Sequence, residues 1–317
     1  MRTCRIIIVN YRTKELVADC LQSLEAEMRQ EPGCHVIIAD NASPDDSVGY
    51  LKNIIAQHNW TWASVLPLPK NGGFSYGNNA GIRPLFETDN DIRYIHLLNP
   101  DTIVRPGAIS RLLDFLEEHS EVGIAGSFLE EIDGTPQCAA FNFHSVLSEF
   151  ERGLRFGLVT KILHRQMVAP PPGGPTRRVN WVSGASMMIR REVFEDIGLF
   201  DEDYFLYYEE TDFELRARRA GWPIWHVAES KVVHLEGAST GVTGAGRALK
   251  RVPSYWFESR RRYFRKHHGS GYEFMANLAY ASAYGAWRIR RKLQGKPDPD
   301  PPRLWQDFVR FNFGLGR

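Results

Sequence analysis

Residues 4–43 read CRIIIVNYRTKELVADCLQSLEAEMRQEPGCHVIIADNAS, and this stretch decides the fold. Residues 4–9 form a short apolar run that predicts a buried strand, and residues 35–39 predict a second one. Between them, apolar side chains recur at helical spacing at Leu16, Val17, Cys20, Leu21 and Leu24. This strand–helix–strand order is typical of an α/β protein with a mainly parallel central sheet flanked by helices.

The alternation continues along the chain. A helix is expected after the second strand, with apolar positions at Val48, Leu51, Ile54 and Ile55. Residues 94–98 predict a further central strand, and a helix is expected over about 106–118, with Pro106 at its opening.

Polar residues follow three of these predicted strands. The strands end in Asn10, in Asp40 and in Asn99-Pro100-Asp101. Ligands of open α/β sheets bind beyond the carboxyl ends of the strands. The three polar ends therefore predict a nucleotide site at one edge of the sheet.

Composition indicates a globular chain with two electrically different regions. The protein has 317 residues, of which 43% are hydrophobic and 24% charged, and these values exclude disordered and collagen-like classes. The net charge is +1, but residues 247–317 hold 16 Lys and Arg against 5 Asp and Glu. We expect one α/β domain over 1–246, with a nucleotide half over about 1–128 and a second half over about 129–246, followed by a basic, aromatic-rich helical region over 247–317.

The N-terminus and the cysteines bear on location. The apolar run after Arg2 is too short for a signal peptide, so a cytoplasmic protein is expected. The four cysteines show no metal-binding spacing and predict reduced, mostly buried thiols.

The less regular stretch 130–178 contains a proline-rich segment, 170–175, which predicts a surface loop that could serve as a hinge or lid.

An acidic cluster is the strongest chemical signal. Tyr207-Tyr208 is followed by Glu209, Glu210 and Asp212 at the start of an amphipathic helix. The helix dipole favours acidic side chains there and could account for one of them, for which we choose Asp212. It does not account for three. An apolar neighbourhood would raise the pKa of such a carboxyl into the range of a general base.

Three further candidates are each open to a structural explanation. Asp101 could coordinate Mg²⁺ or Mn²⁺ or could be a turn residue. Asn71-Gly72-Gly73-Phe74 could bring the backbone close to a ligand or could be a turn entering a helix; it is neither a Walker loop nor a dinucleotide fingerprint. His234, at the end of a β-branched run, could be a ligand or a structural histidine.

These motifs, in this order, resemble those of the family 2 glycosyltransferases, which have the GT-A fold. The resemblance also includes Trp181-Val182-Ser183-Gly184-Ala185, residues 198–203 and Gly221-Trp222. The resemblance covers roughly residues 4–240. It implies an enzyme that transfers a sugar from a nucleotide-sugar to an acceptor hydroxyl with inversion at the sugar carbon.

The resemblance also implies roles for individual residues. Glu210 would be the catalytic base, as the second member of an acidic pair with Glu209, and Asp212 is the alternative. A divalent cation would be held by Asp101 and His234. The nucleotide-sugar contacts would be Val9, Asn10, Tyr11, Asp40, Asn41, Asn71, Gly72, Phe74 and Asn99. The acceptor would lie near Trp181, Ser183, Gly184 and Asp201.

Asn-Pro-Asp at 99–101 together with the acidic cluster resembles the bacterial rhamnosyltransferases that use dTDP-rhamnose and build surface polysaccharide. There are three alternatives. They are a UDP-sugar-dependent hexosyl- or galactofuranosyltransferase, a nucleotidyltransferase, and a non-catalytic nucleotide- or carbohydrate-binding module. Nucleotidyltransferases normally carry a glycine- and arginine-rich loop after the first strand, where this chain has residues 10–13, NYRT.

The basic C-terminal region carries Tyr280, Tyr284, Trp287, Trp305, Phe308, Phe311 and Phe313. Aromatic and basic residues on amphipathic helices suit the surface of an anionic membrane. The alternative is a pair of helices packed on the catalytic core. No segment reaches 18 uninterrupted apolar residues, so no membrane-spanning helix is expected.

Overall fold

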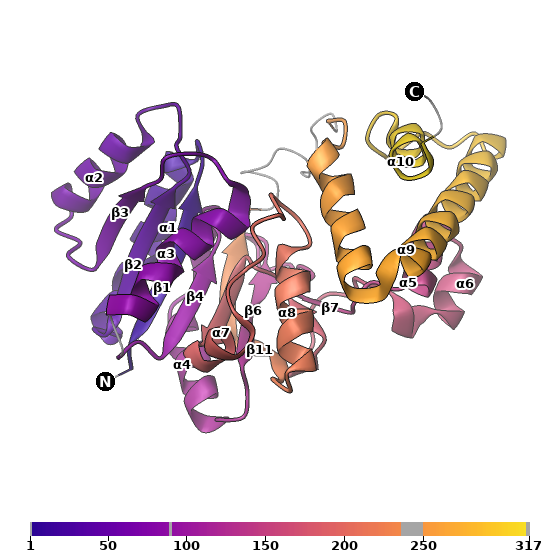
Figure 1. The fold of residues 1–317 in the computed structure, drawn as a ribbon. Coiled ribbons are helices and arrows are strands. Elements are labelled where there is room, and N and C mark those ends of the chain that lie inside the picture. The colour runs from indigo at the N-terminus through magenta and orange to yellow at the C-terminus, as the bar shows by residue number, and fades with distance from the viewer. Residues whose placement is uncertain (1, 89–90, 236–249, 315–317) are drawn as a thin grey trace. The chain divides into compact units, whose positions relative to one another are not determined.

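The computed structural model describes residues 2–88, 91–235 and 250–314. The chain divides into two compact units. The first, here the sheet unit, comprises Met1–Phe141 and Pro171–Ser239, and the second, the helical unit, comprises Asn142–Pro170 and Thr240–Arg317. Figure 1 shows the elements of both.

The sheet unit is built on one mixed sheet in the order β3-β2-β1-β4-β10-β6-β11-β5, with β8 paired to β11. Its strands are β1 (Cys4–Asn10), β2 (Cys34–Asp40), β3 (Ala63–Pro67), β4 (Tyr94–Leu98), β5 (Thr102–Val104), β6 (Ile124–Glu130), β8 (Arg177–Val179), β10 (Ser186–Arg190) and β11 (Ile224–His234). A separate pair joins β7 (Ala140–Phe141) to β9 (Trp181–Val182).

The expected parallel sheet is present from β3 to β4, where every pairing is parallel. Beyond β4 the sheet becomes mixed. The strand β10 lies antiparallel between β4 and β6, and β6 pairs with β11 in parallel. The fold class is therefore the expected α/β class, with parallel order confined to part of the sheet.

Helices cover both faces of this sheet. Along β1, Ile6 and Ile8 lie in one hydrophobic core and Ile7 lies in the other, because successive side chains of a strand point to opposite faces. A strand buried on both faces reads as a continuous apolar run, which explains the sequence of residues 4–9. The first core packs against α1 (Lys14–Gln30), α2 (Ser47–Gln57) and α4 (Ala108–Glu118), and the second against α3 (Gly73–Thr88), α7 (Arg191–Ile197) and α8 (Glu209–Arg219).

The helical unit contains α5 (Val146–Leu154), α6 (Gly157–Ile162), the 3-10 turn η1 (His164–Gln166), α9 (Ser254–Leu293) and α10 (Leu304–Phe313). The long helix α9 is interrupted at Gly269, whose φ of 83° lies in the left-handed region that glycine tolerates. Its two halves are Ser254–His268 and Ser270–Leu293. Among the buried polar groups of this unit, Arg260 is paired with Glu149 at 2.9 Å.

The aromatic residues expected at a membrane surface are largely internal to the helical unit. Tyr280, Tyr284, Trp287 and Phe308 form its core with Phe257, and each is at most 9% exposed. Their burial corrects the expectation for these side chains, because they supply the apolar surface that holds α9 and α10 together. None of the helices in the described ranges combines the length and apolar character needed to cross a bilayer.

The division into units differs from the expected division in one respect. Residues 142–170, expected in the second half of the first domain, 129–246, belong with the C-terminal helices. Contacts such as Glu149 with Arg260, 111 residues apart, create this grouping and leave no local signal in the sequence. The expected boundary at 246/247 lies outside the described residues. The proline-rich segment 170–175 forms neither helix nor strand, as expected, and one crossing between the units falls within it.

Candidate active site

The carboxyl ends of β1 and β2 bring two of the predicted nucleotide contacts together. Asn10 and Asp40 are register partners, and the Asn10 side chain donates from Nδ2 to Asp40 Oδ2 at 2.6 Å. Ser43 donates to the same carboxylate from its backbone N–H at 2.9 Å and from its hydroxyl at 2.8 Å. Asp40 is 1% exposed, so these donors fix the direction of its side chain.

Residues on either side of this pair differ in exposure. Tyr11 is 40% exposed, whereas Val9 is buried. Asn41 donates from Nδ2 to the Gly73 carbonyl at 2.9 Å, which ties the end of β2 to the start of α3. The predicted residues of 9–11, 40–41 and 71–74 therefore belong to one connected region.

The loop 71–74 has a backbone that requires glycine. Gly73 has a φ of 87°, and a Cβ at this position would lie 2.0 Å from the Phe205 carbonyl oxygen. Asn71 accepts from the Gly73 N–H at 3.0 Å, and Phe74 donates its N–H to the Phe205 carbonyl at 2.8 Å. A Cβ at Gly72 would lie 2.4 Å from the Tyr76 ring, so this position is also closely packed.

The two predicted metal ligands lie beside each other. β5 pairs antiparallel with β11 so that His234 lies opposite Thr102, the residue after Asp101. His234 Nε2 is 3.5 Å from Asp101 Oδ1, and Asp101 is 1% exposed. Asn99 donates its N–H to the Ala185 carbonyl at 3.0 Å, which connects the same loop to the segment after β9.

One carboxylate and one imidazole fit a hard divalent cation that takes its other ligands from phosphate and water. The residues that the structure describes contain no group of three or more acidic, histidine or cysteine side chains able to enclose a metal by themselves. The donor set thus suits a cation shared with a bound diphosphate and does not suit a closed structural site.

The acidic cluster begins α8. The two residues before Glu209 have left-handed backbone, with φ of 71° at Tyr207 and 68° at Tyr208. Such a conformation is costly for residues with large side chains and is found preferentially at functional sites. Here it turns the chain into α8 so that Glu209 and Glu210 occupy the first two positions of the helix.

Glu209 and Glu210 are neighbouring buried carboxyls whose charges act on each other. Burial and the neighbouring Glu210 carboxylate raise the pKa of Glu209 well above its usual value. Burial also raises the pKa of Glu210, while its own backbone N–H and the Glu209 side chain oppose that rise. Both carboxyls therefore keep a proton to higher pH than an exposed glutamate does.

Asp212 has a different environment. Its Oδ2 accepts from Arg216 Nε at 2.9 Å, and its Oδ1 accepts from the Tyr204 hydroxyl at 3.3 Å. Arg216 also donates to the carbonyls of Ile197 at 2.6 Å and Leu199 at 2.9 Å. The Asp212–Arg216 pair thus anchors the segment before α8, which is a structural role beyond the helix-dipole role expected for Asp212.

The predicted acceptor residues lie in two places. Trp181 stacks on Phe141 with ring centroids 4.1 Å apart, and Ser183 donates its N–H to the Ala139 carbonyl at 3.0 Å. Asp201 accepts from the Asp203 N–H at 3.1 Å in a turn. No contact recorded for the described residues joins Asp201 to the acidic pair, so its role as an acceptor contact stays a prediction.

Gly184 lies between the loop 71–74 and the start of α8. A Cβ built on Gly184 would lie 3.7 Å from the Phe74 ring and 3.9 Å from the Glu210 Cβ, which are ordinary van der Waals distances. The loop 71–74, the segment 183–185 and the start of α8 therefore converge on one place.

Glu214 belongs to the same environment and was missed by sequence reasoning. It follows Glu210 by one helical turn and is fully buried, and it accepts from the Val182 N–H at 2.9 Å. Burial, with a contribution from the Glu210 charge, raises its pKa well above the usual value. The four-residue spacing from Glu210 was visible in the sequence, but nothing there distinguished it from the polar face of an amphipathic helix.

Comparison with known proteins assigns the family. A family model described as "Glycosyl transferase family 2" matches residues 5–198. The chain is 27% identical over 306 residues to the N-acetylglucosaminyl-diphospho-decaprenol L-rhamnosyltransferase of Mycobacterium tuberculosis, covering 92% of this chain and 89% of that protein. It is 26% identical over 235 residues to the rhamnosyltransferase WbbL of Escherichia coli K12, covering 72% and 82%.

A solved structure agrees on the fold. The mannosyltransferase PcManGT of Pyrobaculum calidifontis, determined in complex with GDP-Man and Mn²⁺, superposes with a TM-score of 0.59 at 12% identity, covering 99% of this chain and 81% of that one. The family match spans more than half of the chain and includes the loop 71–74, Asp101 and the segment 183–185. The chain therefore belongs to glycosyl transferase family 2, with the GT-A fold expected from its sequence, and is a glycosyltransferase.

Proposed function

We propose that this enzyme transfers a sugar from a nucleotide-sugar to an acceptor hydroxyl in a single displacement that inverts the anomeric carbon. The observation that carries the proposal is the convergence of Phe74, Gly184 and Glu210, together with the burial that raises the pKa of Glu210. A carboxyl with a raised pKa is thus available where the proposed donor and acceptor segments meet.

Glu210 acts as the base in this proposal. An acceptor hydroxyl is a weak nucleophile, and a carboxylate aligned behind it can take its proton as attack proceeds. The acceptor oxygen forms a bond to the anomeric carbon, the bond from that carbon to the diphosphate oxygen breaks, and the proton moves to Glu210. One such carboxylate is sufficient for inversion, since no covalent sugar–enzyme intermediate is required.

Asp101 and His234 would hold the divalent cation. When bound, Mg²⁺ or Mn²⁺ neutralises the charge that develops on the leaving diphosphate. The Asp101 carboxylate and the His234 imidazole would each supply one ligand, and phosphate oxygens and water would have to supply the others. Asp40, oriented by Asn10 and Ser43, would accept hydrogen bonds from the nucleotide.

The donor that we favour is dTDP-rhamnose, with an acceptor hydroxyl on a lipid-linked or oligosaccharide substrate of polysaccharide or glycolipid synthesis. Two relatives are rhamnosyltransferases, and one of them is named for a lipid-diphosphate-linked sugar. UDP-linked hexoses and galactofuranose are the competing donors. We place the enzyme at the inner face of the cytoplasmic membrane, where a lipid-linked acceptor would be found.

A donor panel tests the proposal. The enzyme is incubated with Mg²⁺, an acceptor mixture and, in turn, dTDP-rhamnose or a UDP-sugar, and release of the nucleoside diphosphate is measured. Faster release from dTDP-rhamnose supports the donor assignment, and faster release from a UDP-sugar replaces it. Nucleotide binding by calorimetry with no release from any donor would contradict the proposed reaction.

A further inference from the structure

Exposed apolar side chains are concentrated in the helical unit. Of the twelve large hydrophobic side chains that are exposed in the described ranges, nine belong to this unit, although it is the smaller of the two. Single exposed hydrophobic residues are ordinary on a protein surface, whereas a group of them marks a surface that binds something. The arrangement of these nine therefore decides whether they form such a group.

The part of α9 after Gly269 carries an uncharged stripe along one face of the helix. Its six members follow one another at intervals of 3, 4, 4, 3 and 4 residues, which is the spacing of one helical face. They are Met275, Leu278, Ser282, Ala286, Ile289 and Leu293, and all six are exposed. The Ser282 hydroxyl donates to the Leu278 carbonyl at 2.7 Å, so its polar group is bound within the helix. We call these six residues the α9 stripe.

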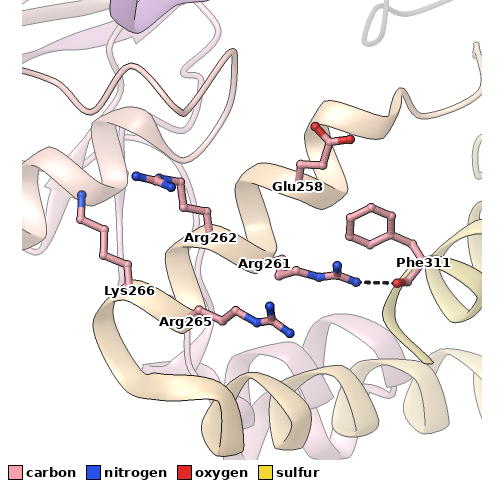
Figure 2. A pocket seen from close by; sticks show the side chains of 6 residues that line it. All are labelled: Glu258, Arg261, Arg262, Arg265, Lys266 and Phe311. Atoms are coloured by element: carbon pink, nitrogen blue, oxygen red, sulfur yellow. Dashed lines mark hydrogen bonds between the residues drawn. The ribbon is translucent and has the colours of Figure 1, made fainter. Parts of the chain in front are cut away.

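The other faces of α9 are covered by α5 and α10. A Cβ built on Gly153 of α5 would lie 3.0 Å from the α9 backbone, so the two helices pack closely. Trp305 of α10 donates its indole N–H to the Ala281 carbonyl at 3.0 Å. Figure 2 shows that α10 also holds the first half of α9, where Arg261 donates to the Phe311 carbonyl. The α9 stripe is the face that these two helices leave exposed.

A second group of exposed apolar side chains lies beside the C-terminal end of α9. Arg290 of α9 donates to the Arg155 carbonyl at 2.8 Å, and its guanidinium lies over the Phe156 ring, 5.1 Å from the centroid. Phe156 is itself exposed, and α6, which follows it directly, exposes Leu158 and Ile162 one helical turn apart. Arg290 thus ties this segment to the end of α9 that carries the last members of the stripe.

Both of these segments are strongly basic. Residues 155–166 contain three Lys and Arg and residues 286–296 contain five, while neither segment contains Asp or Glu. Two of the arginines pair with Asp298 and Asp300. The remaining cations give this end of the helical unit an excess of positive charge beside its exposed apolar side chains.

This charge distinguishes between the partners that an exposed apolar stripe can take. A second copy of the chain would bring the same cations to the contact, and like charges placed opposite one another oppose association. An anionic lipid surface supplies the opposite charge, and its acyl region accepts apolar side chains. Charge complementarity therefore favours a lipid surface.

We propose that the α9 stripe and residues 156–162 dock the helical unit onto a membrane that contains anionic phospholipid. The apolar side chains enter the boundary between headgroups and acyl chains, and the lysines and arginines of the two segments meet the lipid phosphates. The aromatic residues that the sequence suggested for a membrane surface take no part, because they form the core of the unit. The inference does not rest on the proposed reaction, since docking requires neither donor nor divalent cation.

Vesicle binding by the full chain in EDTA tests the apolar contribution. Ile289→Gln and Ile132→Gln remove the same side chain from positions that are 65% and 67% exposed, and Ile132 lies in the sheet unit, between β6 and β7. On vesicles of phosphatidylcholine with phosphatidylglycerol, we expect Ile289→Gln to bind about fivefold more weakly than the parent, and I289Q/L293Q about twentyfold. Ile132→Gln should bind within about twofold of the parent. Circular dichroism and the thermal midpoint verify that each variant folds.

A pair of lysine variants tests the contribution of charge. Lys292 and Lys52 are both exposed residues of helices, but only Lys292 lies beside the α9 stripe. At low salt, Lys292→Gln should weaken binding to the phosphatidylglycerol vesicles about threefold and leave binding to pure phosphatidylcholine unchanged. Lys52→Gln should change neither.

Three results would overturn the inference. The first is a parent protein that does not bind the phosphatidylglycerol vesicles, and the second is equal binding by Ile289→Gln, Ile132→Gln and the parent. The third is a parent that sediments as a dimer without vesicles and becomes a monomer in Ile289→Gln, which would assign the α9 stripe to an interface between copies. Because no donor is present, a protein that docks as expected but transfers no sugar would contradict the proposed function and leave this inference in place.

Discussion

Glu149 in the helical unit and Glu209 in the sheet unit are both buried, but their pKa values shift in opposite directions. Burial alone would raise the pKa of Glu149, but the charges of Arg152 and Arg260 hold it well below its usual value. Glu209 has a carboxyl group as its neighbour, and burial raises its pKa well above the usual value. The partner, and not the degree of burial, decides the charge of each group.

The same contrast occurs within α8. Asp212 is buried against the Arg216 guanidinium at 2.9 Å, whereas burial raises the pKa of Glu209, Glu210 and Glu214. Carboxylates paired with arginine, such as Asp212, hold segments together. Carboxyls without such compensation have raised pKa values suited to proton transfer.

We expect the largest effect on sugar transfer from removing the divalent cation that Asp101 and His234 would hold together with the substrate diphosphate. Because Asp101 and His234 supply only two ligands, EDTA should abolish transfer, and Mg²⁺ or Mn²⁺ should restore it. Nucleoside diphosphate release measures both. Full turnover in chelator would remove the metal from the proposed reaction.

Breaking the charge compensation around Glu149 should cost stability in the helical unit. In Arg260→Met, the buried Glu149 carboxylate loses one of its two arginines, and we expect the free energy of opening of α9 to fall by about 3 kcal/mol. Hydrogen exchange of α9 amides measures this opening. The exposed Arg310→Gln, within about 0.5 kcal/mol of the parent, is the control.

Glu149 and Glu209 should make the free energy of unfolding depend on pH in opposite ways. The pKa of Glu209 is raised in the folded state. Its protonated carboxyl therefore contributes stability that is fully present below the unfolded-state pKa of about 4.5 and is lost as the pH rises. The pKa of Glu149 is lowered in the folded state. Its ionised carboxylate therefore contributes stability above that pH, and this contribution is lost on acidification. Glu209→Gln should therefore gain stability relative to the parent between pH 5 and pH 8, roughly the interval above that pKa. A pH-independent difference in unfolding midpoint would contradict the raised pKa.

The smallest effect is expected at Glu214. If its carboxyl is protonated, Glu214→Gln keeps a neutral acceptor for the Val182 N–H and should change stability by less than about 1 kcal/mol. Glu214→Ala leaves that N–H without its acceptor and should cost about 1–3 kcal/mol. Urea unfolding of the two variants compares them. Equal losses would mean that Glu214 is ionised or that packing alone is responsible.

The sequence predicted the part of the fold that depends on local pattern. The runs at 4–9 and 35–39 are apolar except for Arg5 and His35, because both faces of β1 and β2 are covered. Their polar ends meet because parallel strands share an edge. The insertion of β10 antiparallel between β4 and β6 was not predictable in this way, since strand order is set by contacts distant in sequence.

The same limit applies to the site. Asp101 and His234 were predicted as partners through the family resemblance, and β5–β11 pairing does bring them to 3.5 Å. The role of Glu214 depends on its contact with Val182, 32 residues away, and the grouping of 142–170 with α9 depends on Glu149 and Arg260. Neither contact has a periodic signal, so neither could be inferred from spacing.

Glu210, the second member of the buried acidic pair, is the proposed base for glycosyl transfer. The direct measurement is turnover of Glu210→Gln beside Glu210→Asp, with nucleotide affinity from calorimetry as the check on binding. We expect Glu210→Gln to retain nucleotide affinity and to lose about 10²–10⁴-fold in turnover, with partial recovery in Glu210→Asp. Unchanged turnover in Glu210→Gln would contradict the claim.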